Sequence, residues 1–255
     1  MIPVLFQIGS FKIGSYGVMM VVAFLTCLWL LRRELVKNQF NGDWAFTIVT
    51  AAAIGGIIGA RLYLILENLH DFLLDPSGMI FSRSGLTWYG GFIGGFIAVV
   101  WTIHRFQASD LRIVDLVAPL LILGYGIGRI GCLLAGDGDY GPPSNLPWAM
   151  SFPHGMIPTD VPVHPTPIYE TLLSLLLFTV LWRLRKRNHI PGLMLGGMLI
   201  FYGLERFTTE FWRITPKVLW GWLSAAQILS VFAILFGLIW SVYSIRKRRT
   251  GADGE

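Results

Sequence analysis

The sequence predicts an all-α integral membrane protein, a seven-transmembrane helix bundle with a small extracytoplasmic cap segment. Of the 255 residues, 54% are apolar and only 14% are charged, which leaves too few polar side chains to cover a water-soluble globule. Seven apolar runs of about 18 to 22 residues are each long enough to cross a hydrocarbon core as a helix. Basic residues gather in alternate loops between these runs, as the positive-inside rule requires.

The predicted spans follow one another along a single transmembrane catalytic domain, residues 1–255. A polar stretch at about 67–85 predicts an extended outer arm, and a longer one, rich in Pro and Gly at about 136–166, predicts the cap. Residues 1–13 are expected along the outer membrane surface, and without a basic n-region or cleavage site the first span is expected to stay in the mature protein. The runs begin near Gly14, Ala45, Leu86, Ile113, Pro167, Pro191 and Leu219.

The net charge of +5 does not indicate a nucleic-acid partner, because the basic residues follow alternate spans instead of lining one face. These loops are predicted to be cytoplasmic, so the N-terminus lies outside and the C-terminus inside. Cys27 and Cys132 fall near opposite ends of their spans, so neither a disulfide nor a thiolate metal site is predicted. The basic loop residues are Arg32, Arg33, Lys37, Arg105, Arg112, Arg183, Arg185, Lys186, Arg187 and the run 246–249.

Two arginines interrupt apolar spans early in the chain. Arg129 opens the stretch GRIGCLLAGDGDYG, residues 128–141, directly after an apolar run, and Arg61 follows the glycines of GGIIGARLYLILE in the second span. A charge at such a depth needs a partner or a water-filled cavity, which makes both functional candidates. With Tyr63, Arg61 is expected to line a polar cavity; snorkelling to the interface is the alternative for both arginines.

A second group of polar residues lies in the fifth and sixth spans. Tyr202, Arg206 and Glu210 are spaced four apart and therefore share one helix face. Glu170 lies one turn inside the fifth span, where we expect it to pair with an arginine. Because a guanidinium matches phosphate oxygens bidentately and keeps its charge at any physiological pH, Arg129 and Arg206 indicate a site for an anionic lipid headgroup.

These stretches resemble the prolipoprotein diacylglyceryl transferases, integral membrane enzymes, and the resemblance extends over spans one to six. The signature stretch keeps the Gly-Arg-x-Gly start and the Tyr-Gly end, with Asp137 or Asp139 in place of the family's acid; HPTPIYE and the Tyr, Arg, Glu spacing of the sixth span also match. The matching residues are Gly128, Arg129, Gly131, Tyr140, Gly141, His164, Tyr169, Glu170, Tyr202, Arg206 and Glu210.

The chain departs from the family pattern at several positions. Cys132 replaces an asparagine, and Arg129 to Gly141 is about one residue longer than the pattern. Tyr89 replaces the histidine of a His-Gly-Gly motif; its phenol, with an ordinary pKa of about 10, is expected to donate a hydrogen bond, and an interfacial belt position is the alternative. Pro167 and the stretch 214–217 also differ from the family's residues.

The resemblance implies transfer of the sn-1,2-diacylglyceryl group from phosphatidylglycerol to the lipobox cysteine thiol of a prolipoprotein signal peptide, without cofactor or metal. The nucleophile then belongs to the substrate, and Cys132 is a packing residue. Glu210, Asp137, Asp139 and Tyr89 all stay open as proton acceptors. The implied catalytic residues are Arg129, Arg206, Tyr89, Glu210 and Asp137; the implied substrate-binding residues are Arg129, Arg206, Tyr16, Arg61, Tyr202, Gly141 and Glu170.

Two other classes of function stay open from the sequence. A secondary transporter or channel for an anionic solute also builds its site from glycine-broken helices and buried arginines. A non-catalytic lipid-binding membrane protein could keep the phosphate site without the chemistry. The absence of a recognisable internal repeat, and arginine motifs near one membrane face, favour the enzyme. The expected location is the bacterial plasma membrane, the inner membrane where there are two.

Overall fold

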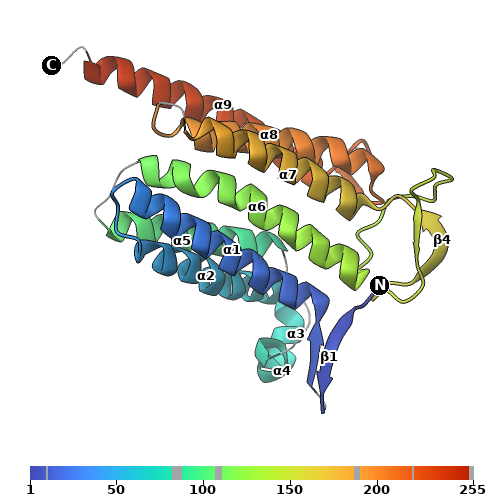
Figure 1. The fold of residues 1–255 in the computed structure, drawn as a ribbon. Helices are drawn as coiled ribbons and strands as arrows, with labels where there is room; N and C mark the ends of the chain where they lie inside the picture. The colour runs from blue at the N-terminus through green and yellow to red at the C-terminus, as the bar shows by residue number, and fades with distance from the viewer. Residues whose placement is uncertain (10, 82–87, 107–110, 187–189, 220, 253–255) are drawn as a thin grey trace. The chain divides into compact units, whose positions relative to one another are not determined.

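In a computed structural model of the chain, most of the sequence folds into helices (Figure 1). The structure describes residues 1–255 apart from 10, 82–87, 107–110, 187–189, 220 and 253–255. The long helices are α1 Ser15–Lys37, α2 Trp44–Glu67, α5 Trp88–Arg105, α6 Leu111–Ala135, α7 Thr166–Leu184, α8 Leu193–Thr209 and α9 Ala225–Ala252; the short ones are α3 Leu69–Leu74, α4 Pro76–Phe81 and the 3-10 turn η1 Glu210–Trp212. The strands are β1 Val4–Ile8, β2 Phe11–Gly14, β3 Met150–Phe152, β4 Thr159–Val163, β5 Lys217–Leu219 and β6 Leu223–Ser224.

Five of the described helices, α1, α2, α6, α7 and α9, are long and apolar enough to cross a membrane. The chain is therefore an all-α membrane protein in its main architecture, while α5 and α8 are not among these five. The first six predicted runs each begin within two residues of a helix start. The seventh helix begins later than predicted, at Ala225, because 217–219 and 223–224 form the β5–β6 hairpin.

The contacts divide the chain into two compact units. One unit joins Met1–Cys27 to Val114–Glu255, and the other is Leu28–Ile113. The boundaries fall inside α1 and α6, and the expectation of a single domain stays a prediction.

In the smaller unit, Leu28–Ile113, α2 packs against α5 through glycines. A methyl group on Gly55 would lie 2.7 Å from the carbonyl oxygen of Gly94, and one on Gly59 would collide with the backbone of Gly90 and Gly94. The predicted close approach at the glycines of the second span is thus confirmed. Arg61 Nη1 donates to the carbonyl of Met79 at 3.1 Å and so ties α2 to α4.

The arm at about 67–85 is helical where it was expected to be extended. It contains α3 and α4, and the Asp75 carboxylate caps the second of these by accepting the Gly78 N–H at 2.9 Å. No residue of α3 is buried, as expected of an arm with little core of its own. Residues 82–87 of the arm lie outside the described part of the chain.

In the larger unit, α8 packs against both α7 and α9. Glycines again allow the approach, since a methyl group on Gly203 would lie 2.7 Å from the Ser230 carbonyl oxygen. An apolar cluster of α6, α7 and α8 fills the space beside them. Its buried members are Ala118, Ile122, Leu181, Met194 and Met198.

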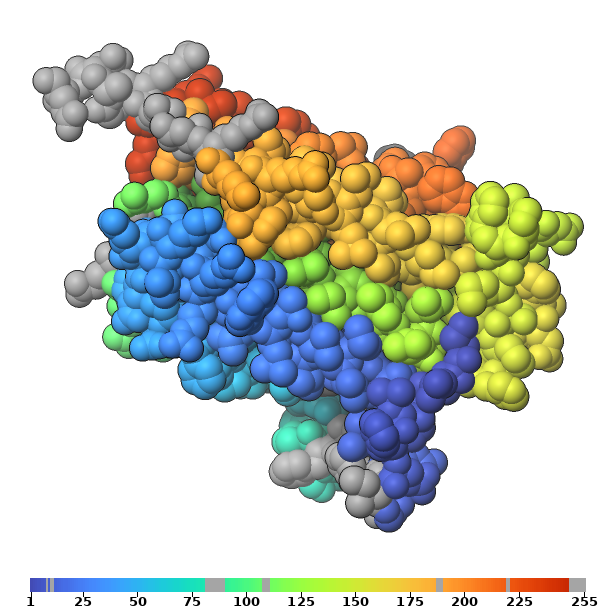
Figure 2. All heavy atoms as spheres, viewed as in Figure 1, coloured from blue at the N-terminus to red at the C-terminus, as the bar shows by residue number. Residues whose placement is uncertain are grey.

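Besides the β5–β6 hairpin, two other pairs of short strands lie in the described part of this unit. Residues 4–8 and 11–14 pair as the β1–β2 hairpin, in a segment that was expected along the membrane surface. Gly9, after β1, has a positive φ of +61°. The 136–166 segment holds the β3–β4 pair and its own small core, in which the Tyr140 and Phe152 rings stack with centroids 4.1 Å apart. In Figure 2 this segment, coloured yellow-green, lies against the N-terminal end of α7.

Candidate active site

The predicted arginines meet where α6 and α8 end and α7 begins. Arg129 lies near the end of α6, Arg206 near the end of α8, and Glu170 one turn inside α7, which has a proline near its start. Gly136, with φ +62°, ends α6 and turns the chain so that Asp139 comes back over Arg129. All of these residues belong to the larger unit.

Glu170 is the centre of the site. Its carboxylate is fully buried, with Oε2 at 3.0 Å from Nε of Arg129. The other oxygen, Oε1, lies 3.4 Å from Nη1 of Arg206 and 3.4 Å from Nη1 of Arg213. The expected pairing of Glu170 with an arginine is confirmed, and the partners come from three segments of the chain.

Two further carboxylates complete the network. Asp139 forms ion pairs with both Arg129 and Arg213. Glu210 Oε2 lies 2.7 Å from Nη1 of Arg206, one helical turn away as the spacing predicted, and Oε1 accepts a hydrogen bond from Thr215. We call the six residues the ion-pair cluster: Arg129, Arg206, Arg213, Asp139, Glu170 and Glu210.

The ion-pair cluster carries three positive and three negative charges when all its members are ionised, so its own charges balance. Its guanidiniums are not fully used, however. Among the described residues, nothing bonds to Nη2 of Arg129 or to Nε and Nη2 of Arg206. These N–H groups remain as donors for an incoming anion.

The carboxyls beyond the helix ends differ in how readily they take a proton. Burial acts to raise the pKa of Asp139, but the guanidiniums of Arg129 and Arg213 lower it overall. Burial also acts to raise the pKa of Glu210, which the hydroxyl of Thr215 and the charge of Arg206 lower overall. Asp137 is the opposite case, because its burial outweighs its hydrogen bonds and its pKa is raised.

A second polar layer lies next to the ion-pair cluster, one helical turn back along α6 and α8. Tyr125 precedes Arg129 by four residues, and Tyr202 precedes Arg206 by four. The two rings meet edge to face with centroids 5.3 Å apart, and the Arg129 guanidinium carbon lies 5.0 Å from the Tyr125 ring centroid. With Glu205, which is 6% exposed, they form what we call the tyrosine–glutamate layer.

The tyrosine–glutamate layer is short of hydrogen-bond partners. Neither carboxylate oxygen of Glu205 has one among the described residues, and the buried hydroxyl of Tyr125 also has none. Unpaired buried polar atoms are rare in folded proteins, because each loses its water without compensation.

At Gly141 the backbone passes close to other parts of the chain, where a side chain would not fit. Its N–H donates to the His164 carbonyl at 2.9 Å, and a methyl group here would collide with the Trp212 carbonyl and lie 2.6 Å from His164 Cβ. Gly141 thus lets the 136–166 segment pass close to the end of α8. Its predicted role in substrate binding stays a prediction.

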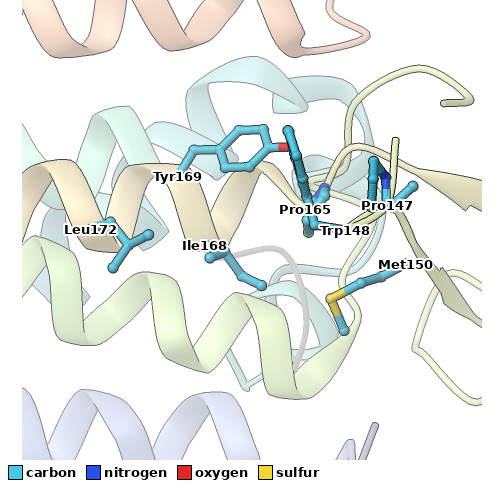
Figure 3. Close-up of a pocket in the computed structure, with 8 residues that line it drawn as sticks. Pro147, Trp148, Met150, Pro165, Ile168, Tyr169 and Leu172 are labelled. Atoms are coloured by element: carbon cyan, nitrogen blue, oxygen red, sulfur yellow. The ribbon is translucent and has the colours of Figure 1, made fainter. Parts of the chain in front are cut away.

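A shallow apolar hollow of about 550 Å³ lies between the 136–166 segment and α7 (Figure 3). The Tyr169 hydroxyl accepts from Trp148 Nε1 at 2.8 Å and lies 3.2 Å from His164 Nδ1, which joins the two elements at one edge. The lining residues are Pro147, Trp148, Ala149, Met150, Pro165, Ile168, Tyr169 and Leu172.

The other predicted residues lie outside the ion-pair cluster. Tyr16, at the start of α1, packs beside Gly131 of α6, within the larger unit. Arg61 and Tyr89 belong to the smaller unit; Tyr89 is in α5, and its side chain lies outside the described part of the chain. Asp137, one of the implied catalytic residues, accepts the Asp139 N–H at 3.2 Å, and its catalytic role stays a prediction.

Sequence reasoning missed Arg213 and Glu205 as residues of this region, and left Asp139 open beside Asp137. In the structure Asp139 bridges two arginines, Arg213 reaches three carboxylates, and Glu205 is buried near them. One signal was present, since Arg213 follows Glu210 by three residues and so falls on the same face of a helix. Ligand atoms of Cys132, Asp137 and Asp139 lie within 4.8 Å of one another, but both Asp139 oxygens already pair with guanidiniums, which makes these residues a poor metal site.

Comparison with known proteins identifies the family. A family model described as "Prolipoprotein diacylglyceryl transferase" matches residues 3–243. The chain belongs to this family. It is similar to the phosphatidylglycerol–prolipoprotein diacylglyceryl transferase of Pseudomonas putida, at 37% identity over 95% of this chain and 94% of the relative. The protein of the same name from Clostridium tetani is 34% identical over 96% of this chain and 99% of the relative.

Family membership explains several of the observations above. As a prolipoprotein diacylglyceryl transferase the chain is an enzyme of lipoprotein biosynthesis, which fits its membrane-spanning helices. The resemblance noted from the arginine and tyrosine motifs is confirmed over nearly the whole chain.

Proposed function

We propose that the chain transfers the sn-1,2-diacylglyceryl group from phosphatidylglycerol to the lipobox cysteine thiol of a prolipoprotein. The names of its relatives supply the two substrates. The observation that supports this proposal most directly is the ion-pair cluster, in which three guanidiniums surround the buried carboxylate of Glu170. A bilayer component with a phosphate fits such a site better than an uncharged lipid does.

The phosphate would bind to the unused N–H groups of Arg129 and Arg206. Because these N–H groups are not engaged by the carboxylates of the ion-pair cluster, they can donate hydrogen bonds to a bound anion while every existing ion pair stays in place. The sulfur attacks the saturated sn-3 carbon of the diacylglyceryl group, the C–O bond to phosphate breaks, and glycerol phosphate leaves. The guanidiniums stabilise the negative charge that grows on the departing phosphate.

The proposed topology has seven spans, with α5 and α8 crossing the membrane in addition to the five longer helices. The N-terminus lies outside and the C-terminus in the cytoplasm of a bacterial cell, so the ion-pair cluster and the 136–166 segment lie at the outer face of the plasma membrane. Reporters fused after Arg249 test this. Fluorescent-protein signal without alkaline phosphatase activity is the expected result, and the reverse would show that the orientation is wrong.

The reaction is tested with purified protein in detergent. Phosphatidylglycerol and a lipobox peptide should give glycerol phosphate and a thioether-linked peptide, and release should depend on the cysteine. Lipid binding without release would indicate a non-catalytic lipid-binding protein. An anion flux through protein in vesicles, with no thioether product, would instead support the secondary transporter or channel.

A further inference from the structure

We infer that Glu205 accepts the proton of the substrate thiol. Here the inference deepens the proposed function, on which it rests, by assigning the base that the reaction requires. A free cysteine thiol has a pKa of about 8.5, so most of it is protonated at neutral pH and a nearby acceptor increases the reactive thiolate.

The first argument is availability. The three carboxylates of the ion-pair cluster are committed: Asp139 to two arginines, Glu170 to three, and Glu210 to Arg206, Arg213 and Thr215. Asp137 accepts the Asp139 N–H and follows the end of α6, so it lies past the phosphate-binding donors along that helix, on the opposite side from Tyr125. A carboxylate that already accepts hydrogen bonds from guanidiniums is a poor proton acceptor. By contrast, neither oxygen of Glu205 has a hydrogen bond to a described residue, although only 6% of the residue is exposed.

The second argument is direction. The Arg206 guanidinium reaches forward along α8 to Glu210, whereas helical side chains at positions such as Glu205 lean back toward the preceding turn, here that of Tyr202. Tyr125 lies likewise one turn back from Arg129, a rise of about 5.4 Å along the helix. The tyrosine–glutamate layer is thus deeper in the proposed membrane than the phosphate-binding donors.

The geometry of the reaction selects this deeper layer. Displacement at a saturated carbon places the nucleophile, the carbon and the leaving oxygen in line. With the phosphate at Arg129 and Arg206, the glycerol carbon and acyl chains extend toward the membrane interior, and the sulfur approaches from the side away from the phosphate. A Glu205 side chain that leans back toward the turn of Tyr202 extends to that side, whereas the carboxylates of the ion-pair cluster are held at the guanidiniums.

The proton transfer is balanced within the site. The thiol S–H bond breaks and its proton moves to a Glu205 oxygen, the sulfur electron pair forms the C–S bond, and the electron pair of the C–O bond leaves with glycerol phosphate. The proton then passes to the departing phosphate or to water. The ionisable groups whose charges act on Glu205 and its layer are Glu170, Arg206, Arg129, Arg213, Tyr125 and Tyr202.

The test is Glu205→Gln, assayed with lipobox peptides that carry cysteine or selenocysteine. A selenol is far more acidic than a thiol and needs no base at neutral pH. With the cysteine peptide we expect kcat to fall about 10²-fold or more, with the KM for phosphatidylglycerol changed less than about twofold. The selenocysteine peptide should restore the variant to within about tenfold of wild type. The residual cysteine activity should rise toward pH 8.5, about the thiol pKa.

Comparison variants separate this role from a structural one. Arg129→Lys weakens phosphate binding, so selenocysteine should not rescue it. Ser244→Ala removes another buried polar atom, in α9, that also has no hydrogen-bond partner among the described residues, and it should leave both activities unchanged. If Glu205→Gln does not fold in detergent, Glu205→Asp and Glu205→Ala are compared instead. Glu205→Asp keeps a carboxylate, so its ratio of cysteine-peptide rate to selenocysteine-peptide rate should be closer to the wild-type ratio than that of Glu205→Ala.

Two outcomes would overturn the inference. One is wild-type activity of Glu205→Gln with the cysteine peptide, and the other is an equal loss with both peptides. If wild type transfers to neither peptide, the proposed function itself fails. The two failures are therefore distinguishable in one set of assays.

Discussion

Replacing Glu170 with glutamine should destabilise the protein strongly. The buried carboxylate lies 3.0 Å from Arg129 and 3.4 Å from both Arg206 and Arg213, so the change leaves three guanidiniums with two carboxylates. Removing one partner of a buried ion pair costs about 3–5 kcal/mol, because the remaining charge is buried without compensation. At about 2–4 °C per kcal/mol for chains near this size, the unfolding midpoint should fall by roughly 6–20 °C.

The assay is thermal unfolding in detergent, and Glu205→Gln is the matched control. It makes the same chemical change in a similarly buried side chain that no guanidinium pairs with in the described structure, so it should cost about 1 kcal/mol or less. Added phosphatidylglycerol should stabilise Glu170→Gln more than wild type, since an anion restores the charge balance. Equal shifts in the two variants would refute the assignment of Glu170 as the centre of the network.

Three further predictions follow from the same region. Arg129→Lys keeps the charge but loses the planar fork, and should abolish most transfer activity while the protein still unfolds cooperatively; near-normal turnover would point to simple snorkelling. Gly141→Ala should lower the free energy of unfolding by about 1–3 kcal/mol, because its methyl group meets the Trp212 carbonyl; an unchanged midpoint would contradict this contact. The pKa of Asp139 is lowered in the folded protein, so the ionised carboxylate contributes its full stabilisation above the unfolded-state pKa of about 3.9 and loses it as the pH falls through the folded-state pKa. In an acid titration the free energy of unfolding of wild type should therefore fall more than that of Asp139→Asn. Parallel losses in the two proteins would exclude this ion-pair contribution.

Much of the helical architecture could be predicted from composition and periodicity. Apolar runs must form helices in a bilayer, because the backbone N–H and C=O groups have no water to bond with there. Glycine spacing also predicted the close packing of α2 with other helices. The short elements were harder to predict. The N-terminal hairpin, the helices of the arm and the β5–β6 hairpin depend on local turns, which hydropathy does not encode.

The candidate site divides in the same way. Arg129, Arg206, Glu170 and Glu210 stood out in the sequence, because a charge within or next to an apolar run needs a partner. The sequence by itself also determined which residues on one helix share a face, as with Arg206 and Glu210. These conclusions require only the helical repeat and the cost of burying charge.

Only the tertiary structure decided which charges pair and which carboxylate stays free. Asp139 and Asp137 are two residues apart and chemically identical, and the turn after α6 places Asp139 between Arg129 and Arg213. Glu205 neighbours Arg206 in sequence, yet its carboxylate is buried with no hydrogen bond to any residue that the structure describes. Pairing between helices depends on where separate segments meet and on which way each side chain leaves its helix, and one chain's local pattern does not contain that information.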